Sequence, residues 1–124
     1  EDEFAILPFG SDLTEGELHK KAVSYEYPPV SVSCGDPEND ADEFTFVEFD
    51  TAGGTVVATA VYPEDGNILM RFCNYSDNEA EAILKTKIGE VSAEVDLLGN
   101  EITKVEQGKL KFRPWEIKTV KITF

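Results

Sequence analysis

One histidine and two cysteines are the residues of this chain most typical of nucleophilic catalysis and of zinc binding. His19 is the sole histidine among 124 residues, and Lys20 and Lys21 follow it directly. A serine or cysteine nucleophile needs a base such as histidine within hydrogen-bond reach. An isolated histidine among charged residues is typically exposed, so we predict that His19 faces solvent and has no catalytic or ligand role.

Spacing typical of metal ligands is missing from the sequence. A zinc site requires three or four His, Cys or carboxylate ligands, and His19, Cys34 and Cys73 are widely separated. Residues 36–43 resemble a calcium-binding loop in their alternating acids, but they lack its turn glycine and its distal glutamate. We therefore predict a solvated acidic loop and no metal or cofactor site in this chain. The alternating acids are Asp36, Glu38, Asp40 and Asp42.

Two further chemical patterns carry little information. Paired carboxylates catalyse glycoside hydrolysis, but a chain with 25 acidic residues contains such pairs by chance. Asn74-Tyr75-Ser76 matches the N-glycosylation pattern, yet it ends an apolar run and such triplets are common. The sequence therefore predicts no catalytic residue.

The net charge of −14 lies entirely in one half of the chain. Residues 1–65 hold sixteen acids and two lysines, whereas residues 66–124 hold nine acids and nine bases. The electrostatic field of this negative charge repels nucleic-acid phosphates and anionic lipid. No apolar run approaches the roughly 20 residues of a membrane span, and no secretion signal opens the chain. We exclude nucleic acid and membrane as partners.

Cysteine usage indicates a reducing compartment. Two cysteines do not form a disulfide framework, and a chain of this length can bury a core without one. Cys73 lies in an apolar run and is expected to be a small buried hydrophobe, with a Cys34–Cys73 disulfide as the less favoured alternative. A bacterial cytoplasmic location is our prediction.

The elements that must position these residues begin with one strand and one helix. Residues 4–7 are apolar and precede Pro8, which predicts an opening strand. Thr14 followed by Glu17 is a capping box and predicts a short helix near the N-terminus. Pro28 and the proline after it end that helix, because proline lacks the amide donor.

From residue 44 onward, β-branched and aromatic residues recur in short runs separated by Gly, Asn and Asp turns. This spacing predicts a mainly all-β fold, an antiparallel β-sandwich with eight strands in this region. The run at 68–75 is apolar on both faces apart from Arg71 and is expected to be central. The predicted strands are 44–49, 55–62, 68–75, 80–87, 91–97, 102–105, 110–112 and 116–124.

The last strand has an irregular pattern. In a strand, every second residue faces the same side of the sheet. Trp115 and Ile117 would therefore face one side and Val120 and Ile122 the other, unless the strand is irregular between them. We predict a β-bulge near Lys118 or the residue after it.

We expect a single β-sandwich domain over residues 1–124. Residues 1–43 would hold the opening strand, the helix and the acidic loop, and 44–124 the strands of the main sheets. Met70 is the only methionine, and the chain opens directly on strand-like residues. We therefore interpret the chain as a C-terminal fragment of a longer polypeptide.

Several segments resemble glycoside hydrolase family 38, the α-mannosidases. Residues 110–119, Leu-Lys-Phe-Arg-Pro-Trp-Glu-Ile-Lys-Thr, resemble the closing motif of that family. Residues 64–72 are similar to its acidic turn and the apolar strand that ends in Arg and an aromatic residue, and 96–99 are similar to its next strand end. Residues 4–8 and the helix running into Tyr27 resemble the start of this region, although Phe9 replaces the customary histidine.

The resemblance implies the C-terminal β-sandwich region of a zinc-dependent retaining α-mannosidase that hydrolyses terminal α-mannosides. The zinc ligands and the nucleophilic aspartate would lie in a separate catalytic domain of the same polypeptide. This chain would then be a noncatalytic support that buries a sheet face against that partner, and mannosides would bind only through the parent enzyme. The alternatives are a carbohydrate-binding or surface adhesion module, and a structural domain of an unrelated enzyme.

Four residues are candidates for a domain interface or for the rim of the parent's sugar site: Glu64, Asp65, Arg71 and Trp115. Turn chemistry before Gly66 is the simpler explanation of the first two. Arg71 needs a carboxylate or carbonyl partner if it is buried, and a structural pair is favoured over a substrate contact. Trp115 is expected in the core, with an anchor on the catalytic domain as its alternative.

Overall fold

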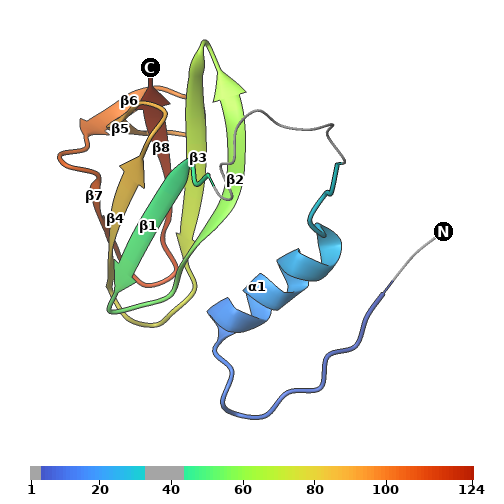
Figure 1. The fold of residues 1–124 in the computed structure, drawn as a ribbon. Coiled ribbons are helices and arrows are strands. Elements are labelled where there is room, and N and C mark those ends of the chain that lie inside the picture. Colours follow the sequence, from blue (N-terminus) through green and yellow to red (C-terminus); the bar gives the residue numbers. More distant parts are fainter. Residues whose placement is uncertain (1–3, 33–43) are drawn as a thin grey trace.

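The computed structural model describes residues 4–32 and 44–124. The acidic loop at 36–43 and Cys34 lie outside these residues. The described parts of the chain contain eight strands and one helix. Figure 1 shows how they are arranged. The elements are α1 (Glu15–Glu26), β1 (Val47–Ala52), β2 (Val56–Glu64), β3 (Asn67–Asn74), β4 (Ala80–Thr86), β5 (Glu90–Val95), β6 (Glu101–Lys104), β7 (Lys109–Phe112) and β8 (Ile117–Thr123).

The strands form two antiparallel sheets. One sheet has the order β1-β4-β7 and the other has the order β2-β3-β8-β5-β6. Each of the eight predicted strands is present within three residues of its expected bounds. The prediction of a mainly all-β antiparallel sandwich with one short helix is therefore confirmed.

The hydrophobic core lies between the two sheets. Alternate residues of each strand face inward, as the period of two requires. Phe72 of the larger sheet meets Phe49 of the smaller one edge to face, with ring centroids 5.4 Å apart. Burying a side chain of this size stabilises the fold by about 1.5–3 kcal/mol. The buried core cluster comprises Val56, Met70, Phe72, Ala80, Ala82, Leu84, Leu110, Phe112, Val120 and Ile122.

The prediction of a bulge in the last strand is wrong. β8 pairs with β3 in an unbroken register from Ile117 opposite Cys73 to Ile122 opposite Ile68. Trp115 lies in the turn before the strand, and Ile117 simply faces outward, so the parity conflict disappears. The register shift beside β8 occurs in β5 instead, between Val91 and the alanine two residues later. β3 is an interior strand as expected, while β8 is the middle strand of the five.

Asn74 joins two loops at one end of the sandwich. Its side chain is fully buried, and its amide group donates to the carbonyl oxygens of Asn78 at 2.7 Å and Arg113 at 3.1 Å. Its side-chain oxygen accepts from the Ser76 hydroxyl at 2.8 Å. Because every polar atom of this side chain has a partner inside the protein, the N-glycosylation pattern at Asn74 is inaccessible in the folded domain.

The predicted capping box is confirmed at the start of α1. The Glu17 amide donates to the Thr14 hydroxyl at 3.3 Å, and the Thr14 amide donates to the Glu17 carboxylate at 2.9 Å. The helix ends at Glu26, directly before the cap residue Tyr27 and the two prolines. The described residues contain no helix that is long and apolar enough to cross a membrane.

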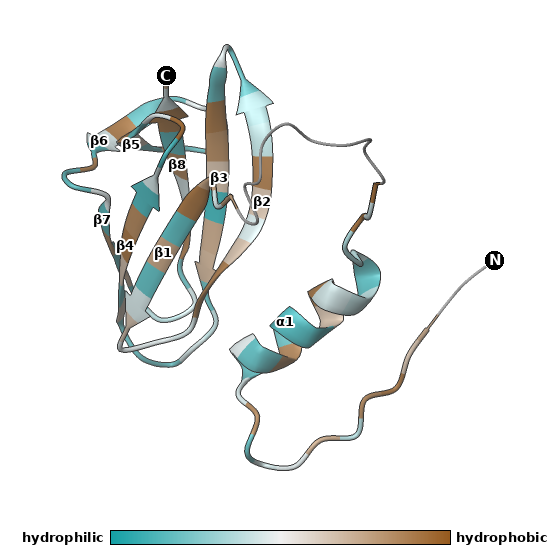
Figure 2. Ribbon diagram, in the orientation of Figure 1, coloured by the Kyte–Doolittle hydropathy of each residue, from teal (hydrophilic) through white to brown (hydrophobic). Residues whose placement is uncertain are grey.

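The predicted opening strand at 4–7 is wrong, because residues 4–10 have no regular structure. A strand requires a neighbouring strand to satisfy its backbone hydrogen bonds. This segment runs beside α1, outside the sandwich (Figure 1), and much of it has the colour of apolar residues in Figure 2. Residues 4–10 are all exposed.

Candidate functional site

The four predicted site residues lie along the length of the sandwich and do not converge. Glu64 and Asp65 are at the β2–β3 turn, where Asp65 and Gly66 both have positive φ, 48° and 77°. Two such residues are typical of a tight hairpin turn. Arg71 lies on β3, five residues after Gly66 and roughly 17 Å along the strand at its usual rise. Trp115 lies beyond the opposite end of β3, beside the loop that follows that strand.

The Glu64 carboxylate packs against another turn. It lies so close to Gly99 of the β5–β6 turn that a Cβ there would be 2.5 Å from a carboxylate oxygen. Gly99 also has a positive φ of 82°, which favours glycine. The geometry at this end of the sandwich is thus that of two hairpin turns in contact.

Trp115 is not part of the core. Its side chain is 46% exposed, and it has a positive φ of 58° in the turn between β7 and β8. Its indole N–H donates to Asp77 at 2.9 Å, and its ring meets Tyr75 edge to face. The prediction of a core tryptophan is wrong, because the turn that carries Trp115 lies outside the space between the sheets.

His19 is half-buried, so the prediction that it faces solvent is also wrong. Its ring stacks on Tyr75 with centroids 4.4 Å apart and an angle of 20°. Its Nε2 atom is buried and has no hydrogen-bond partner among the described residues. Close by, a Cβ at Gly16 would overlap the Thr55 methyl group, so α1 approaches the start of β2 at a residue without a side chain. These two contacts hold α1 against the sandwich.

Cys73 lies in the same region, and its thiol is expected to have low reactivity. It is 8% exposed, and burial raises the pKa of its thiol above the ordinary value. The thiol therefore stays protonated near neutral pH, and the thiolate is the reactive form. This agrees with its interpretation as a small buried hydrophobe.

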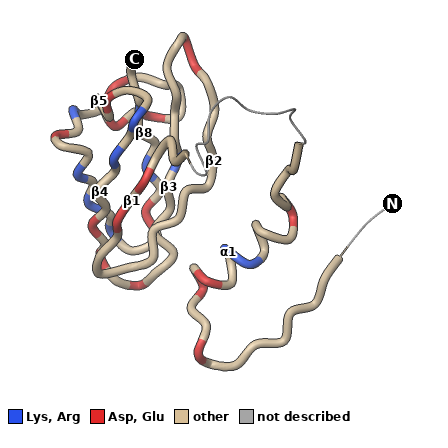
Figure 3. The backbone as a smooth tube through the Cα atoms, viewed as in Figure 1, with Lys and Arg blue, Asp and Glu red and all other residues tan. Residues whose placement is uncertain are grey.

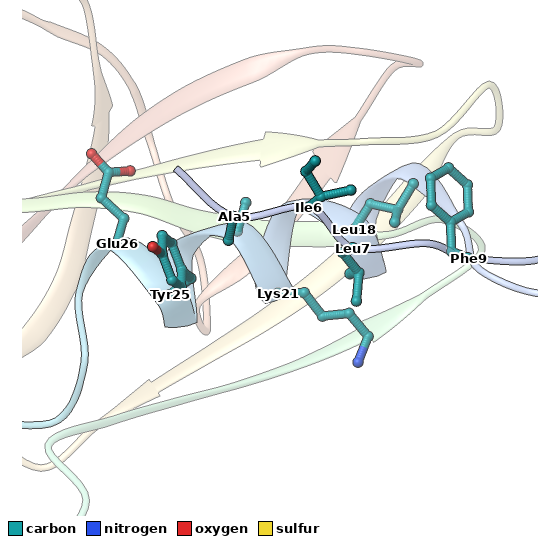
Figure 4. Close-up of a pocket in the computed structure, with 9 residues that line it drawn as sticks. Ala5, Ile6, Leu7, Phe9, Leu18, Lys21, Tyr25 and Glu26 are labelled. Carbon is teal, nitrogen blue, oxygen red and sulfur yellow. The ribbon is translucent and has the colours of Figure 1, made fainter. Parts of the chain in front are cut away.

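A groove of about 810 Å³ lies between residues 4–9 and α1. Figure 4 shows Ile6, Leu7 and Leu18 gathered at one end of the groove, with Tyr25 toward the other. Its lining is mostly apolar. The sequence analysis missed this groove, because the groove depends on how residues 4–9 run past α1. The lining residues are Ala5, Ile6, Leu7, Phe9, Leu18, Lys21, Ala22, Tyr25 and Glu26.

The outer face of the three-stranded sheet has a different character. Lys85 pairs with Asp50 at 3.1 Å and Lys111 pairs with Glu81 at 3.2 Å, and all four side chains are more than 60% exposed. Figure 3 shows acidic and basic positions side by side along these strands. Exposed pairs of this kind contribute little stability and keep the face solvated.

Arg71 lies on the outer face of the five-stranded sheet. Its Nε donates to the Thr119 hydroxyl at 3.4 Å and its Nη2 donates to the Tyr62 hydroxyl at 3.3 Å. The guanidinium also lies 5.9 Å from the centre of the Tyr62 ring. The structural carboxylate or carbonyl partner that we predicted is not found among the described residues, where two hydroxyl groups take its place.

These regions have the features of a domain that binds another protein surface and lacks a catalytic centre among its described residues. Among residues 4–32 and 44–124, no group of three or more His, Cys, Asp or Glu residues could hold a metal ion. The exposed apolar residues, the groove and the half-buried arginine are suited to contacts with another protein surface. The class is thus a β-sandwich domain with surfaces for association.

Comparison with protein families identifies which class of domain this is. The model of the glycosyl hydrolases family 38 C-terminal beta sandwich domain matches residues 55–120, from the start of β2 into β8 and slightly more than half of the chain. The chain belongs to this family, as its motifs indicated. It is thus a noncatalytic domain of a family 38 glycoside hydrolase, which also has a catalytic domain in its larger polypeptide. No curated protein and no solved structure gives a match.

Proposed function

We propose that this chain is the C-terminal β domain of a zinc-dependent retaining α-mannosidase and that it supports the catalytic domain by binding to it. The zinc and the catalytic residues would belong to the catalytic domain. The family assignment supports a role within such an enzyme. Terminal α-mannosides would be the substrates of the parent enzyme.

The observation that carries this proposal is the concentration of exposed apolar side chains in residues 4–32. Contiguous exposed apolar surface usually marks an interaction site, because leaving it in water costs about 25 cal/mol per Å². The predicted docking of a sheet face does not suit the three-stranded sheet, whose outer face carries exposed ion pairs. The exposed large apolar residues in this segment are Phe4, Ile6, Leu7, Phe9, Val23, Tyr25, Tyr27, Val30 and Val32.

The test compares the 124-residue chain with the full-length polypeptide on an aryl α-mannoside. We expect zinc-dependent turnover by the full-length polypeptide and none by the chain alone. NMR of the first-formed sugar should show the α-anomer, which a retaining mechanism produces. Turnover by the chain alone would contradict the division of labour, and a β-anomer would contradict the retaining mechanism.

A carbohydrate-binding module is the second candidate, and the half-exposed Trp115 favours it. Sugars stack on exposed aromatic faces, and Tyr75 lies beside this ring. However, the Trp115 ring is held in place by Asp77, as expected for a residue that joins two loops. Calorimetry of the chain with mannosides decides between the two, since saturable binding that Trp115→Ala abolishes would favour the module.

A further inference from the structure

Arg71 differs from the other half-buried cations of the five-stranded sheet. Lys118 pairs with both carboxylate oxygens of Glu94 at 2.8 and 2.9 Å, and its side chain is 15% exposed. Lys121, 25% exposed, pairs with Glu101 at 3.5 Å. Arg71 is half-buried like them, but in the described parts of the chain no carboxylate pairs with it.

Arg71 has N–H donors that no hydrogen bond to the described residues uses. A guanidinium has five N–H donors in a planar fork that fits a carboxylate with two parallel bonds. Within the described residues only two donors are engaged, both at long distances and both with neutral hydroxyl groups. A half-buried charge with neutral partners is costly, so a carboxylate supplied from outside would be strongly favoured.

The surroundings of Arg71 hold its side chain in place. Arg71 lies opposite Thr119 of β8 and Ala60 of β2 in the strand register, on the face that also carries Leu69 and Cys73. Thr119 is only 4% exposed and Leu69 only 1%. The guanidinium is held by two hydroxyl groups and lies over the Tyr62 ring, and an arginine held in this way loses less entropy on binding than a mobile one.

We propose that Arg71, oriented by Tyr62 and Thr119, binds an Asp or Glu side chain of the catalytic domain and is the polar anchor of the interface between the two domains. This inference rests on the proposed function and names the partner group. Charge complementarity carries it: among residues 4–32 and 44–124 no carboxylate neutralises this half-buried cation, and an acidic partner would. Arginine is also enriched among the residues that dominate interface energetics.

A zero-length cross-linking experiment on the full-length polypeptide tests the proposal. Arg71→Lys places a primary amine at this position, and carbodiimide then joins it to a carboxylate in direct contact. Mass spectrometry should find the introduced lysine linked to an Asp or Glu of the catalytic domain. A link to residues 36–43, or only to carboxylates elsewhere in this domain, would overturn the proposal.

A second measurement uses protection from protease at the junction between the domains. We expect Arg71→Met to raise the cleavage rate of the full-length polypeptide by about 30-fold or more, the lower end of the range for losing one partner of a buried charge pair. The matched control Lys104→Met, an exposed lysine of the same sheet, should leave the rate unchanged. Equal rates for both variants would overturn the proposal, as would a loss of kcat/KM with unchanged protection, which indicates a substrate contact.

The two proposals fail in different ways. If the wild-type junction is as sensitive to protease as an unstructured linker, the domains do not bind each other and the proposed function fails. If the wild-type junction is protected and both variants keep that protection, only the role of Arg71 fails. Near-UV circular dichroism of each variant verifies that the sandwich remains folded.

Discussion

The sandwich and residues 4–32 before it contain similar apolar residues, but many of these are buried in the sandwich and most are exposed in the segment. Between β1 and β8, alternate apolar side chains close a core in which Val120 and Ile122 have no exposed surface. In residues 4–32, Gly16 is the only buried residue, although this segment also contains Phe, Ile, Leu, Val and Tyr. The difference shows that apolar composition predicts a need for burial, whereas a facing surface decides whether burial occurs.

Truncation of a core aromatic should give the largest difference between the two regions. Phe72→Ala removes a side chain that is 1% exposed and should lower the free energy of unfolding by about 3–5 kcal/mol. Phe9→Ala, at a residue that is 58% exposed, should change it by less than about 0.5 kcal/mol. Urea unfolding followed by Trp115 fluorescence measures both. Similar losses for the two variants would show that residues 4–9 pack as tightly as the core.

The next largest effect should come from Asn74. Asn74→Ala leaves the carbonyl groups of Asn78 and Arg113 without their buried donor, and we expect a loss of about 2–3 kcal/mol in the free energy of unfolding. Asn78→Ala is the matched control, because it keeps the backbone carbonyl that accepts this bond. The same urea titration applies, and a loss below about 0.5 kcal/mol for Asn74→Ala would refute the role of this side chain.

Gly16→Ala should separate the helix from the sandwich without unfolding either. The new methyl group overlaps Thr55, while alanine favours the helix itself by up to about 1 kcal/mol. We expect the NMR contacts between the His19 and Tyr75 rings to disappear and the free energy of unfolding to change by less than about 1 kcal/mol. Lys20→Ala, on the exposed side of α1, should keep these contacts. Intact contacts in Gly16→Ala would mean that α1 does not depend on this close approach.

The smallest effect is the pH dependence of the helix cap. Hydrogen bonds from the Thr14 amide and hydroxyl hold the pKa of Glu17 below its ordinary value of 4.5. A lowered pKa stabilises the helix above that value, and this stabilisation disappears as the pH falls through the folded pKa. Far-UV circular dichroism should show a small loss of helix below pH 4.5. Glu17→Gln still caps the helix and should remove this loss, so an unchanged acid transition in that variant would contradict the assignment.

Much of the sandwich could be predicted from local patterns. Runs of β-branched and aromatic residues, with turn residues between them, located all eight strands, and the capping box located α1. The fate of residues 4–7 could not be predicted in this way, because a strand forms only where another strand edge is available to pair with it. The sequence also did not predict that the four candidate site residues would lie along the length of the sandwich and not in one site.

The sequence by itself determined the strand pattern, the helix start and the family, because these depend on residue types at short spacings. Only the tertiary structure decided that Trp115 lies outside the core, that His19 is half-buried against Tyr75, and that Arg71 lacks an acidic partner among the described residues. The physical reason is that these properties depend on contacts between residues far apart in the chain. Such contacts are set by strand order and loop closure.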